Sequence, residues 1–322
     1  MGSFFPWGSL SLVIFLLLHS MLRLSSCCFV AERAALMDIQ SSLGAPDSWG
    51  KDGDDCCSWE HVKCNNSTHR VSHLSFSDVC WTTSKVSCFL NSTVFSALRE
   101  LEHLDLSYCY QCLLSLEGLV GLSKLRYLDL SGAGLRGGFP QFIGEIVSLE
   151  ALALNDNNIT GGLPGAAVRN LRNLRQLNMS YSSFEGNLPG SLFSLPHLKI
   201  LDLSANSLGG RIPISSESGP ISLEVLDLSS NHLNGSLSES VAAFKNIRNL
   251  KLGGNQFSGS LPVSLFALPH LKFLDLSCNN FVGHFPVSLS SEPVPLEVLN
   301  LHDNNMSGAL PSEQAFKNLQ NL

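Results

Sequence analysis

Three patterns in this chain of 322 residues have the residue types and spacing that chemistry requires. Gly132 to Gly137 (GAGLRG) fits the GxGxxG pattern of dinucleotide-binding loops, and Cys109 with Cys112 forms a CxxC pair of the kind used in redox chemistry. The third pattern is a column of matching aspartates that could form an acidic ladder for ions: Asp105, Asp129, Asp202, Asp227 and Asp275. No GxSxG, HExxH or Walker pattern occurs, and the ten histidines show no metal-like spacing.

Each of these patterns has a structural explanation that suits its surroundings better. A dinucleotide loop follows a strand and opens a helix, whereas Pro140 comes soon after Gly137. A CxxC pair in a cysteine-rich, secreted region is more often a structural bridge than a redox centre. The aspartates belong to recurring LDLS-like segments, which favours a solvated structural column. We therefore predict no enzyme activity, no cofactor and no metal site.

The elements that position these residues are set by a repeat. The pattern LxxLxL recurs at spacings of 24 or 25 residues, which indicates one supersecondary unit copied along the chain. Its nine opening residues are Leu101, Leu125, Leu149, Leu174, Leu198, Leu223, Ile247, Leu271 and Leu296. Because a solenoid offers a long surface rather than one deep pocket, the repeat favours a binding function.

A single repeat, LDLSANSLGGRIP, shows how each unit is expected to fold. Leu201 and Leu203 alternate as in a short parallel strand whose leucines point inward. Asn206 follows at the turn, where its amide can satisfy unpaired backbone groups, and Pro213 is expected to end any helix. The matching asparagines are Asn157, Asn231, Asn255, Asn279 and Asn304, whereas Cys109, Ala133 and Ser182 replace asparagine in turns that should be less well braced.

Composition and the N-terminus indicate a secreted protein. The net charge is −7 without any run of Lys or Arg, which disfavours a nucleic-acid partner. Leu10 to Leu18 is an apolar segment of signal-peptide length, so residues 1–26 are expected to be a cleaved signal peptide or, alternatively, an uncleaved anchor. Seven N-x-[ST] sequons predict glycosylation: Asn65, Asn66, Asn91, Asn158, Asn178, Asn234 and Asn305.

Cysteines and hydrophobic spacing predict a separate N-terminal cap. Nine of the ten cysteines lie at or before Cys112, which favours a disulfide-stapled segment. Ala31–Leu43 has helical apolar spacing, with Ala35, Leu36, Ile39 and Leu43 expected to be buried, and the segment 71–76 alternates like a strand. We expect a cap over 27–97 with an irregular insert at 78–94, and then repeats over 98–322, nine complete and a tenth truncated.

The turn and cap motifs carry a family resemblance. The pattern NxLxGxLP, present in LNDNNITGGLP (154–164) and LGGNQFSGSLP (252–262), is similar to the plant-specific class of extracellular leucine-rich repeats. The helix ERAALMDIQSSL followed by CCSWEHVKC resembles the N-terminal cap of plant leucine-rich-repeat receptors, and its paired cysteines are closer to receptor-like proteins than to receptor kinases. The resemblance implies an α/β repeat fold, a right-handed leucine-rich-repeat solenoid with a disulfide-stapled N-terminal cap.

The same resemblance implies part of the disulfide pattern. By it, Cys57 pairs with Cys64 and Cys28 with Cys56. Cys80, Cys88, Cys109 and Cys112 allow three pairings, of which Cys80–Cys88 with Cys109–Cys112 is preferred. Cys278 has no cysteine near it in sequence and is expected on the exposed side of its strand as a free thiol, or else paired with another chain.

Candidate ligand-binding residues are larger groups that interrupt the common LDLS pattern at inner-face positions. Every second side chain of a strand points outward, and neighbouring repeats stack these positions about 4.8 Å apart. The candidates are Tyr108, Tyr127, Asp156, Gln176, Tyr181, Asn249, Lys251, Phe273, His302 and Asp303. A glycan on Asn178 would obstruct this surface, so either that sequon is unused or the ligand binds elsewhere.

The function implied by the resemblance is recognition of a peptide, protein or glycan ligand in defence or development, in the secretory pathway and at the outer face of the plasma membrane. A receptor kinase would act as co-receptor. The final FKNLQNL matches the start of another repeat, so we expect the N-terminal part of a longer protein, with membrane association only through a span beyond Leu322. The alternatives are a secreted inhibitor of the polygalacturonase-inhibitor type and a truncated, non-signalling fragment.

Overall fold

A computed structural model describes residues 28–43, 49–50, 55–77, 88–110, 112–214, 221–286, 295–308 and 319 of the chain. The predicted signal peptide lies outside these residues, as do Cys80 and the side chains of Cys88 and Cys112. Within the described ranges no helix combines the length and apolar character that crossing a bilayer requires.

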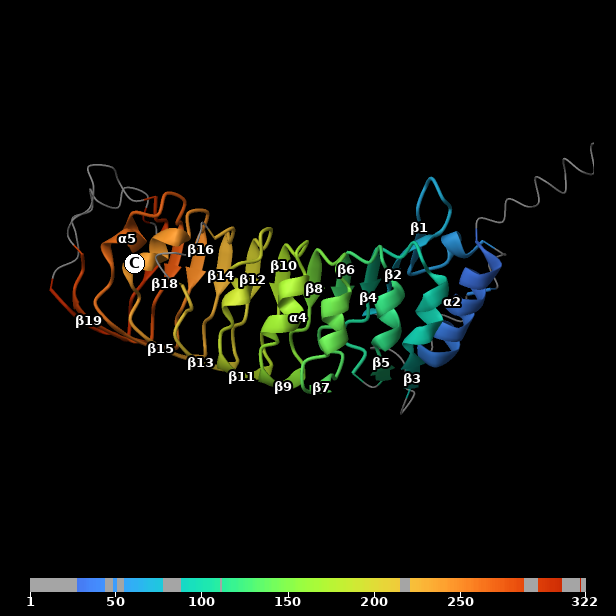
Figure 1. Cartoon of the computed structure of the whole chain (residues 1–322), viewed down its shortest axis with the longest axis horizontal. Coiled ribbons are helices and arrows are strands. Elements are labelled where there is room, and N and C mark those ends of the chain that lie inside the picture. The colour runs from blue at the N-terminus through green and yellow to red at the C-terminus, as the bar shows by residue number, and fades with distance from the viewer. Residues whose placement is uncertain are drawn as a thin grey trace, which may run out of the picture.

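The chain forms one elongated stack of short parallel strands, with helices along one side (Figure 1). The longest sheet among the described residues has eleven strands in the order β1-β2-β4-β6-β8-β10-β12-β14-β16-β18-β20, antiparallel between β1 and β2 and parallel elsewhere. Its strands are β1 Val62–Cys64, β2 Val71–Ser75, β4 His103–Asp105, β6 Tyr127–Asp129, β8 Ala151–Ala153, β10 Gln176–Asn178, β12 Ile200–Asp202, β14 Val225–Asp227, β16 Asn249–Lys251, β18 Phe273–Asp275 and β20 Val298–Asn300.

A second parallel sheet runs along the opposite edge of the stack (Figure 1). Its described strands are β7 Arg136–Gly137, β9 Asn158–Gly162, β11 Ser183–Asn187, β13 Ser207–Gly210, β15 His232–Gly235, β17 Gln256–Gly259, β19 Asn280–His284 and β21 Asn305–Ser307. A separate pair joins β3 Cys88–Asn91 to β5 Cys112–Ser115. The expectation of an irregular insert at 78–94 is therefore wrong at its C-terminal end, because Cys88–Asn91 gains a parallel partner one repeat later.

Short helices connect the two sheets on the remaining side. The described helices are α2 Val30–Leu43, α4 Gly165–Asn170 and α5 Val263–Phe266, and the 3₁₀ turns are η1 Cys56–Ser58, η2 Ser92–Ala97, η3 Glu117–Gly121, η4 Gln141–Glu145, η5 Gly190–Leu192 and η6 Glu239–Ala243. Prolines precede four of them as N-cap residues: Pro140, Pro164, Pro189 and Pro262. The expectation that the repeat proline ends a helix is thus wrong in these repeats, because a missing N–H costs nothing where a helix begins.

The predicted N-terminal cap is present. Helix α2 buries Ala35, Leu36, Ile39 and Leu43, as its spacing predicted. Two disulfides, Cys28–Cys56 and Cys57–Cys64, confirm the pairings implied by the resemblance. Cys109 is also disulfide-bonded, whereas the preferred pairings Cys80–Cys88 and Cys109–Cys112 involve side chains outside the described residues.

Leucines of the repeat fill the space between the sheets and the helices. Leu201 on β12, Leu203 directly after it and Leu208 on β13 are fully buried, as the sequence predicted. Phenylalanines complete the core in several repeats; Phe257 and Phe281 stack with ring centroids 6.3 Å apart. Because each unit packs against its neighbours rather than around one centre, stability depends on the contacts between repeats.

Buried asparagines make the main polar contacts between repeats. The Nδ2 of Asn231 donates to the carbonyls of Leu203, Leu228 and Ser229 at 3.0–3.1 Å, and its Oδ1 accepts from the Leu208 N–H at 3.0 Å. Two of these four partners belong to the preceding repeat. The same arrangement recurs at Asn157, Asn206, Asn255, Asn279 and Asn304.

Three repeats have another residue at this turn position in place of asparagine. Cys109 is buried and disulfide-bonded, and Ala133 is buried. The Oγ of Ser182 is buried without a hydrogen-bond partner among the described residues. The turn at Ser182 is therefore less well braced than its neighbours, as the sequence predicted.

Replacing Asn231 with Ala should lower the free energy of unfolding by about 2–4 kcal/mol, because four backbone groups lose a buried partner. Urea unfolding followed by circular dichroism measures the change. Asn246→Ala, in an exposed turn at the end of the same repeat, is the matched control and should change stability by less than about 0.5 kcal/mol. Equal effects of the two substitutions would contradict a special role for the buried asparagine.

Candidate functional site

The exposed face of the eleven-stranded sheet carries two parallel rows of side chains, which we call the first row and the second row. In the three-residue parallel strands from β4 to β20 the middle residue is buried and the outer two are at least partly exposed, apart from a buried Asp227. The first row consists of His73, His103, Tyr127, Ala151, Gln176, Ile200, Val225, Asn249, Phe273 and Val298. The second row consists of Ser75, Asp105, Asp129, Ala153, Asn178, Asp202, Asp227, Lys251, Asp275 and Asn300.

The aspartates of the second row have the structural role that the sequence indicated. In each case Oδ1 accepts a hydrogen bond from the backbone N–H of a serine two residues later, for example from Ser204 to Asp202 at 3.0 Å. Asn178 takes the same role toward Ser180, with bonds of 3.0 Å to the N–H and 2.8 Å to the hydroxyl. One carboxylate oxygen thus closes each turn, and in Asp105, Asp129 and Asp227 the other binds a neighbouring side chain of the same face.

Three aromatic side chains stack at the N-terminal end of the first row. The rings of His73 and His103 have centroids 5.4 Å apart, and those of His103 and Tyr127 lie 4.1 Å apart and nearly parallel. Tyr127 was predicted from the sequence, whereas the two histidines were not. The 24-residue register that relates His103 to Tyr127 could have found one of them.

The stack shifts the ionisation of its members. Burial, followed by the nearby charge of His73, lowers the pKa of His103 below its ordinary value. Burial and the neighbouring carboxylate of Asp129 raise the pKa of Tyr127 to about 12, and the Tyr127 hydroxyl donates to Asp129 Oδ2 at 3.1 Å. Both rings are therefore neutral near pH 7 and present flat, polar-edged surfaces.

A hollow of about 380 Å³ opens beside this stack. It lies where alanines occupy both rows, at Ala151 and Ala153, between the larger side chains of Tyr127 and Ile200. Its polar lining comes from Asp129, Ser131, Asn155, Gln176, Asn178 and Asp202. The hollow therefore combines an aromatic wall with two carboxylates, and its lining contains no cationic side chain.

A second group of predicted residues meets further along the same face. Lys251 donates to Asp227 Oδ2 at 3.0 Å and lies 6.0 Å from the centre of the Phe273 ring. The hydrogen bond to Asp227 raises the pKa of Lys251. Asn249 stands in the first row beside Phe273. Of the ten predicted residues, Tyr127, Gln176, Asn249, Lys251 and Phe273 lie on strands.

The other five predicted residues follow the strands instead of lying on them. Tyr108, Asp156, Tyr181 and Asp303 have left-handed backbone conformations with φ between 50° and 59°, and His302 directly precedes Asp303. Cys278 shares this conformation and has a free thiol, so its expected place on a strand is wrong. Gly132 and Gly254 occupy the same column. Each strand ends after three residues and the chain then turns. The side chains of the predicted residues that follow the strands therefore lie along the edge of the exposed face.

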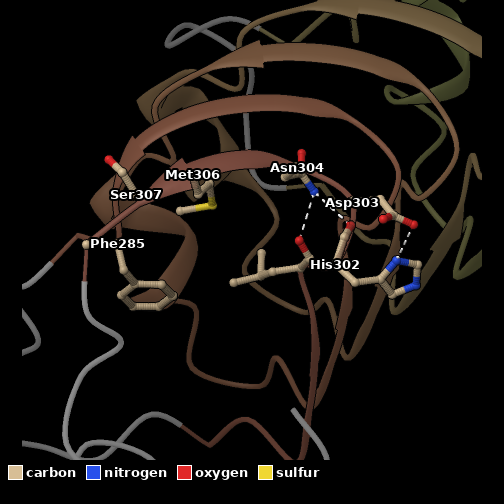
Figure 2. Close-up of a pocket in the computed structure, with 8 residues that line it drawn as sticks. Phe285, His302, Asp303, Asn304, Met306 and Ser307 are labelled. Carbon is tan, nitrogen blue, oxygen red and sulfur yellow. Dashed lines mark hydrogen bonds and ion pairs between the residues drawn. The ribbon is translucent and has the colours of Figure 1, made fainter.

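An apolar hollow of about 270 Å³ lies near the last described strands, lined by Phe285, Leu301 and Met306 with His302 and Asn304 among its polar neighbours (Figure 2). Strands β20 and β21 are the terminal strands of their sheets among the described residues. The lining is repeat core, because Leu301 and Met306 occupy positions that are buried in earlier repeats. We therefore assign this hollow no ligand.

The sequons divide between the two sheets. Asn158, Asn234 and Asn305 are exposed on the second sheet, away from the two rows. Asn178 is half-buried within the second row and lines the hollow. Asn65 and Asn91 each cap a local turn, through bonds to Ser67 and Thr93.

The N-terminal cap and the repeats both match known protein families. A leucine-rich-repeat N-terminal domain matches residues 31–65, and leucine-rich repeats match residues 147–208, 222–244 and 270–291. Receptor-like protein 9b of Arabidopsis thaliana is 31% identical over 156 residues, which is 45% of this chain and 16% of that protein. Receptor-like protein 14 of the same plant is 35% identical over 173 residues, 48% of this chain and 17% of that protein.

Solved structures agree on the fold. A plant ice-binding protein matches with a TM-score of 0.74 and 25% identity, covering 91% of this chain and 94% of that protein. The Arabidopsis receptor kinase HAESA, in complex with the peptide hormone IDA and the co-receptor SERK1, matches with a TM-score of 0.71 and 28% identity, covering 91% of this chain and 53% of that chain.

Stacked parallel strands and the stapled cap define a leucine-rich-repeat protein. In its cap and its repeats, the chain is similar to the plant leucine-rich-repeat receptor-like proteins. It spans less than a fifth of the length of the receptor-like proteins it matches.

The free energy of unfolding should fall as the pH drops below about 6.5, because unfolded His103 binds a proton more readily than folded His103 does. Replacing His73 with Ala should raise the pKa of His103, since it removes both part of its burial and a neighbouring charge. NMR titration of the imidazole resonances measures this. His232→Ala, on the second sheet, should leave the pKa of His103 unchanged; an unchanged value in His73→Ala would refute the stacking explanation.

Asn178 is expected to carry no glycan, whereas Asn158, Asn234 and Asn305 are expected to be glycosylated in protein secreted from plant cells. The Asn178 side chain is engaged with Ser180 and half-buried. Glycopeptide mass spectrometry measures occupancy. Asn178→Asp keeps the bonds to Ser180, as the aspartates of this row do, and should change neither stability nor total glycan mass. A loss of glycan mass in this variant would show that the site is used.

Proposed function

We propose that this chain is the ligand-recognition part of an extracellular receptor-like protein, and that it binds a peptide through the hollow at Ala151 and Ala153. The observation that carries the proposal is this hollow on the exposed face of the eleven-stranded sheet. Its volume of about 380 Å³ lies within the range of pockets that hold small ligands or single side chains. Larger side chains of the first row, Tyr127 and Ile200, stand on either side of it, so a ligand group can enter between them.

The chemistry of the hollow favours a basic or hydrogen-bond-donating group. Asp129 and Asp202 each use Oδ1 to close a turn, and Asp129 Oδ2 accepts from the Tyr127 hydroxyl. The hollow is therefore lined by two carboxylates that hydrogen bonds hold in place. The Tyr127 ring forms one wall, and aromatic faces attract cations. A lysine or arginine side chain, or the N-terminal amine of a peptide, satisfies these groups. The backbone under them is held by the strand ladder, so little ordering entropy opposes binding.

The relatives support the rest of the proposal. Similar folds occur in receptor kinase ectodomains that were solved with peptide hormones, and HAESA was solved with a co-receptor as well. By analogy, this protein works at the outer face of the plasma membrane in defence or development. A partner kinase transmits its signal.

A library of fluorescent peptides, half of them with a lysine or arginine, tests the proposal by polarisation against the purified chain. We expect binding from a subset of the basic peptides. Ala153→Arg should weaken it at least about tenfold, because its side chain fills the hollow and repels a cation. Ser258→Arg introduces the same side chain at an exposed site on β17 of the second sheet and should leave binding unchanged.

Two outcomes would contradict the proposal. Equal binding to wild type and Ala153→Arg would place the ligand away from the hollow. Retention of acidic peptides in preference to basic ones would refute the assigned chemistry. Circular dichroism of both variants confirms that each remains folded.

A further inference from the structure

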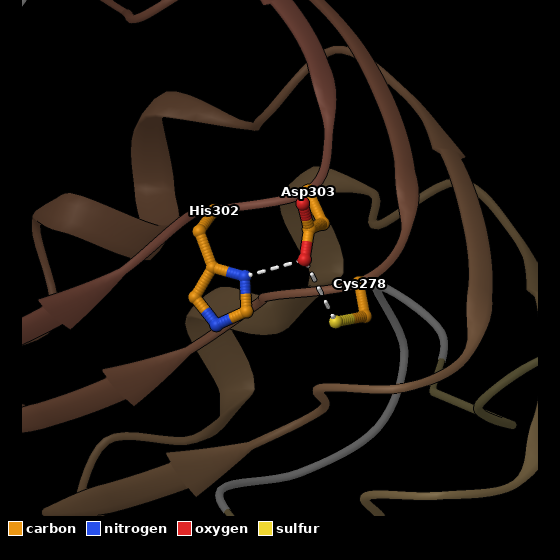
Figure 3. Close-up of side chains that lie close together, drawn as sticks. All are labelled: Cys278, His302 and Asp303. Carbon is orange, nitrogen blue, oxygen red and sulfur yellow. Dashed lines mark hydrogen bonds and ion pairs between the residues drawn. The ribbon is translucent and has the colours of Figure 1, made fainter.

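Three side chains with different donor atoms lie close together across two neighbouring turns of the solenoid. Cys278 belongs to the turn after β18, and His302 with Asp303 belongs to the turn after β20, one repeat later. A sulfur, a ring nitrogen and a carboxylate oxygen lie within 4.8 Å of one another (Figure 3). All three residues are exposed. We propose that this Cys278–His302–Asp303 cluster binds a zinc ion.

The distances suit a tetrahedral ion after small side-chain rotations. His302 Nδ1 lies 2.9 Å and Cys278 Sγ 3.6 Å from Asp303 Oδ2. Bonds of about 2.0–2.3 Å to zinc place tetrahedral ligand atoms roughly 3.5 Å apart. The histidine and the carboxylate need to separate slightly and the thiol to approach the imidazole. Each movement is a rotation of an exposed side chain.

The backbone that carries these side chains is held in place. The Cys278 N–H donates to the His302 carbonyl at 2.9 Å, and the Asn279 N–H donates to the Asp303 carbonyl at 3.2 Å. Asn304 donates to the carbonyls of Leu301 and His302 (Figure 2). Cys278 and Asp303 share the left-handed conformation of their column, with φ of 51° and 54°. The two turns therefore present their side chains in a fixed relation, so an ion meets a partly organised site.

The donor set selects the kind of ion. One sulfur, one nitrogen and one oxygen suit zinc, whereas calcium and magnesium require oxygen ligands. Three protein ligands leave a fourth position for water or for a donor atom of a partner. Without metal, partial desolvation and the carboxylate of Asp303 raise the pKa of the Cys278 thiol, which therefore stays protonated near pH 7. Zinc binding forms a sulfur–zinc bond and releases the thiol proton to solvent.

The signal for this site in the sequence is the repeat period. No short histidine or cysteine motif is present, because one ligand comes from one repeat and two from the next. Cys278 and Asp303 occupy the same left-handed column in neighbouring repeats, and His302 precedes Asp303. A search for metal ligands along the chain misses such a cluster, whereas a search between neighbouring repeats finds it.

Titration of the purified chain, its disulfides intact, with Zn²⁺ in competition with a chromophoric chelator tests the inference. Co²⁺ serves as a spectroscopic probe of sulfur ligation. We expect one ion per chain and a thiolate-to-cobalt charge-transfer band that disappears in Cys278→Ser. Zinc affinity should fall at least about tenfold in His302→Gln and Asp303→Asn. His232→Gln, which alters an exposed histidine on β15, should leave affinity unchanged.

Persistence of the charge-transfer band in Cys278→Ser would overturn the inference, as would unchanged zinc affinity in His302→Gln and Asp303→Asn. Displacement of zinc by an equal concentration of Ca²⁺ or Mg²⁺ would refute the assigned ion. Because all three ligands are exposed side chains, these variants should keep the circular dichroism spectrum of the wild type.

Discussion

The buried asparagine at each turn is the interaction on which the rest of this structure depends. A parallel strand of three residues must reverse direction inside an apolar core, which leaves carbonyl and N–H groups without ladder partners. One carboxamide offers two donors and an acceptor in a fixed plane. Asn206, Asn231 and their equivalents direct all of these to the backbone, with two contacts in their own repeat and two in the preceding one. The same asparagine therefore stabilises both the turn and the stacking of one repeat on the next.

Because the repeats stack regularly, equivalent positions of successive repeats lie side by side in columns. The side chains that share a column determine which contacts the surface can make. Just before the strands, complementary charges meet between repeats, as in Arg126–Glu150–Arg175 and Lys199–Glu224–Arg248. These pairs are exposed and add little stability each, so their main effect is to favour the correct register. The same geometry stacks His73, His103 and Tyr127. It also leaves a hollow where two small alanines, one in each row, lie between larger side chains.

Periodicity predicted what local rules control and missed what depends on neighbours. The strands, the buried leucines and the turn asparagines follow from alternating hydrophobic residues and from the need to hydrogen-bond the backbone, and each could be predicted from one repeat. The cap helix could be predicted from the spacing of its own apolar residues. The left-handed turn after each strand could not, because its column holds tyrosine, glycine, aspartate and cysteine without a common residue type. The hollow was missed for a related reason: Ala151 and Ala153 are unremarkable alone and matter only beside Tyr127 and Ile200.

The fold alone does not choose among functions, since an ice-binding protein and peptide-hormone receptor kinases share this solenoid. Recognition of an ice lattice calls for a flat and repetitive surface. The face described here is neither, because stacked aromatic rings, an acidic hollow and a lysine salt bridge follow one another along the same rows. An irregular array on a rigid scaffold can distinguish one extended partner from another by the order of its side chains. This combination favours a peptide or protein ligand over a crystal surface.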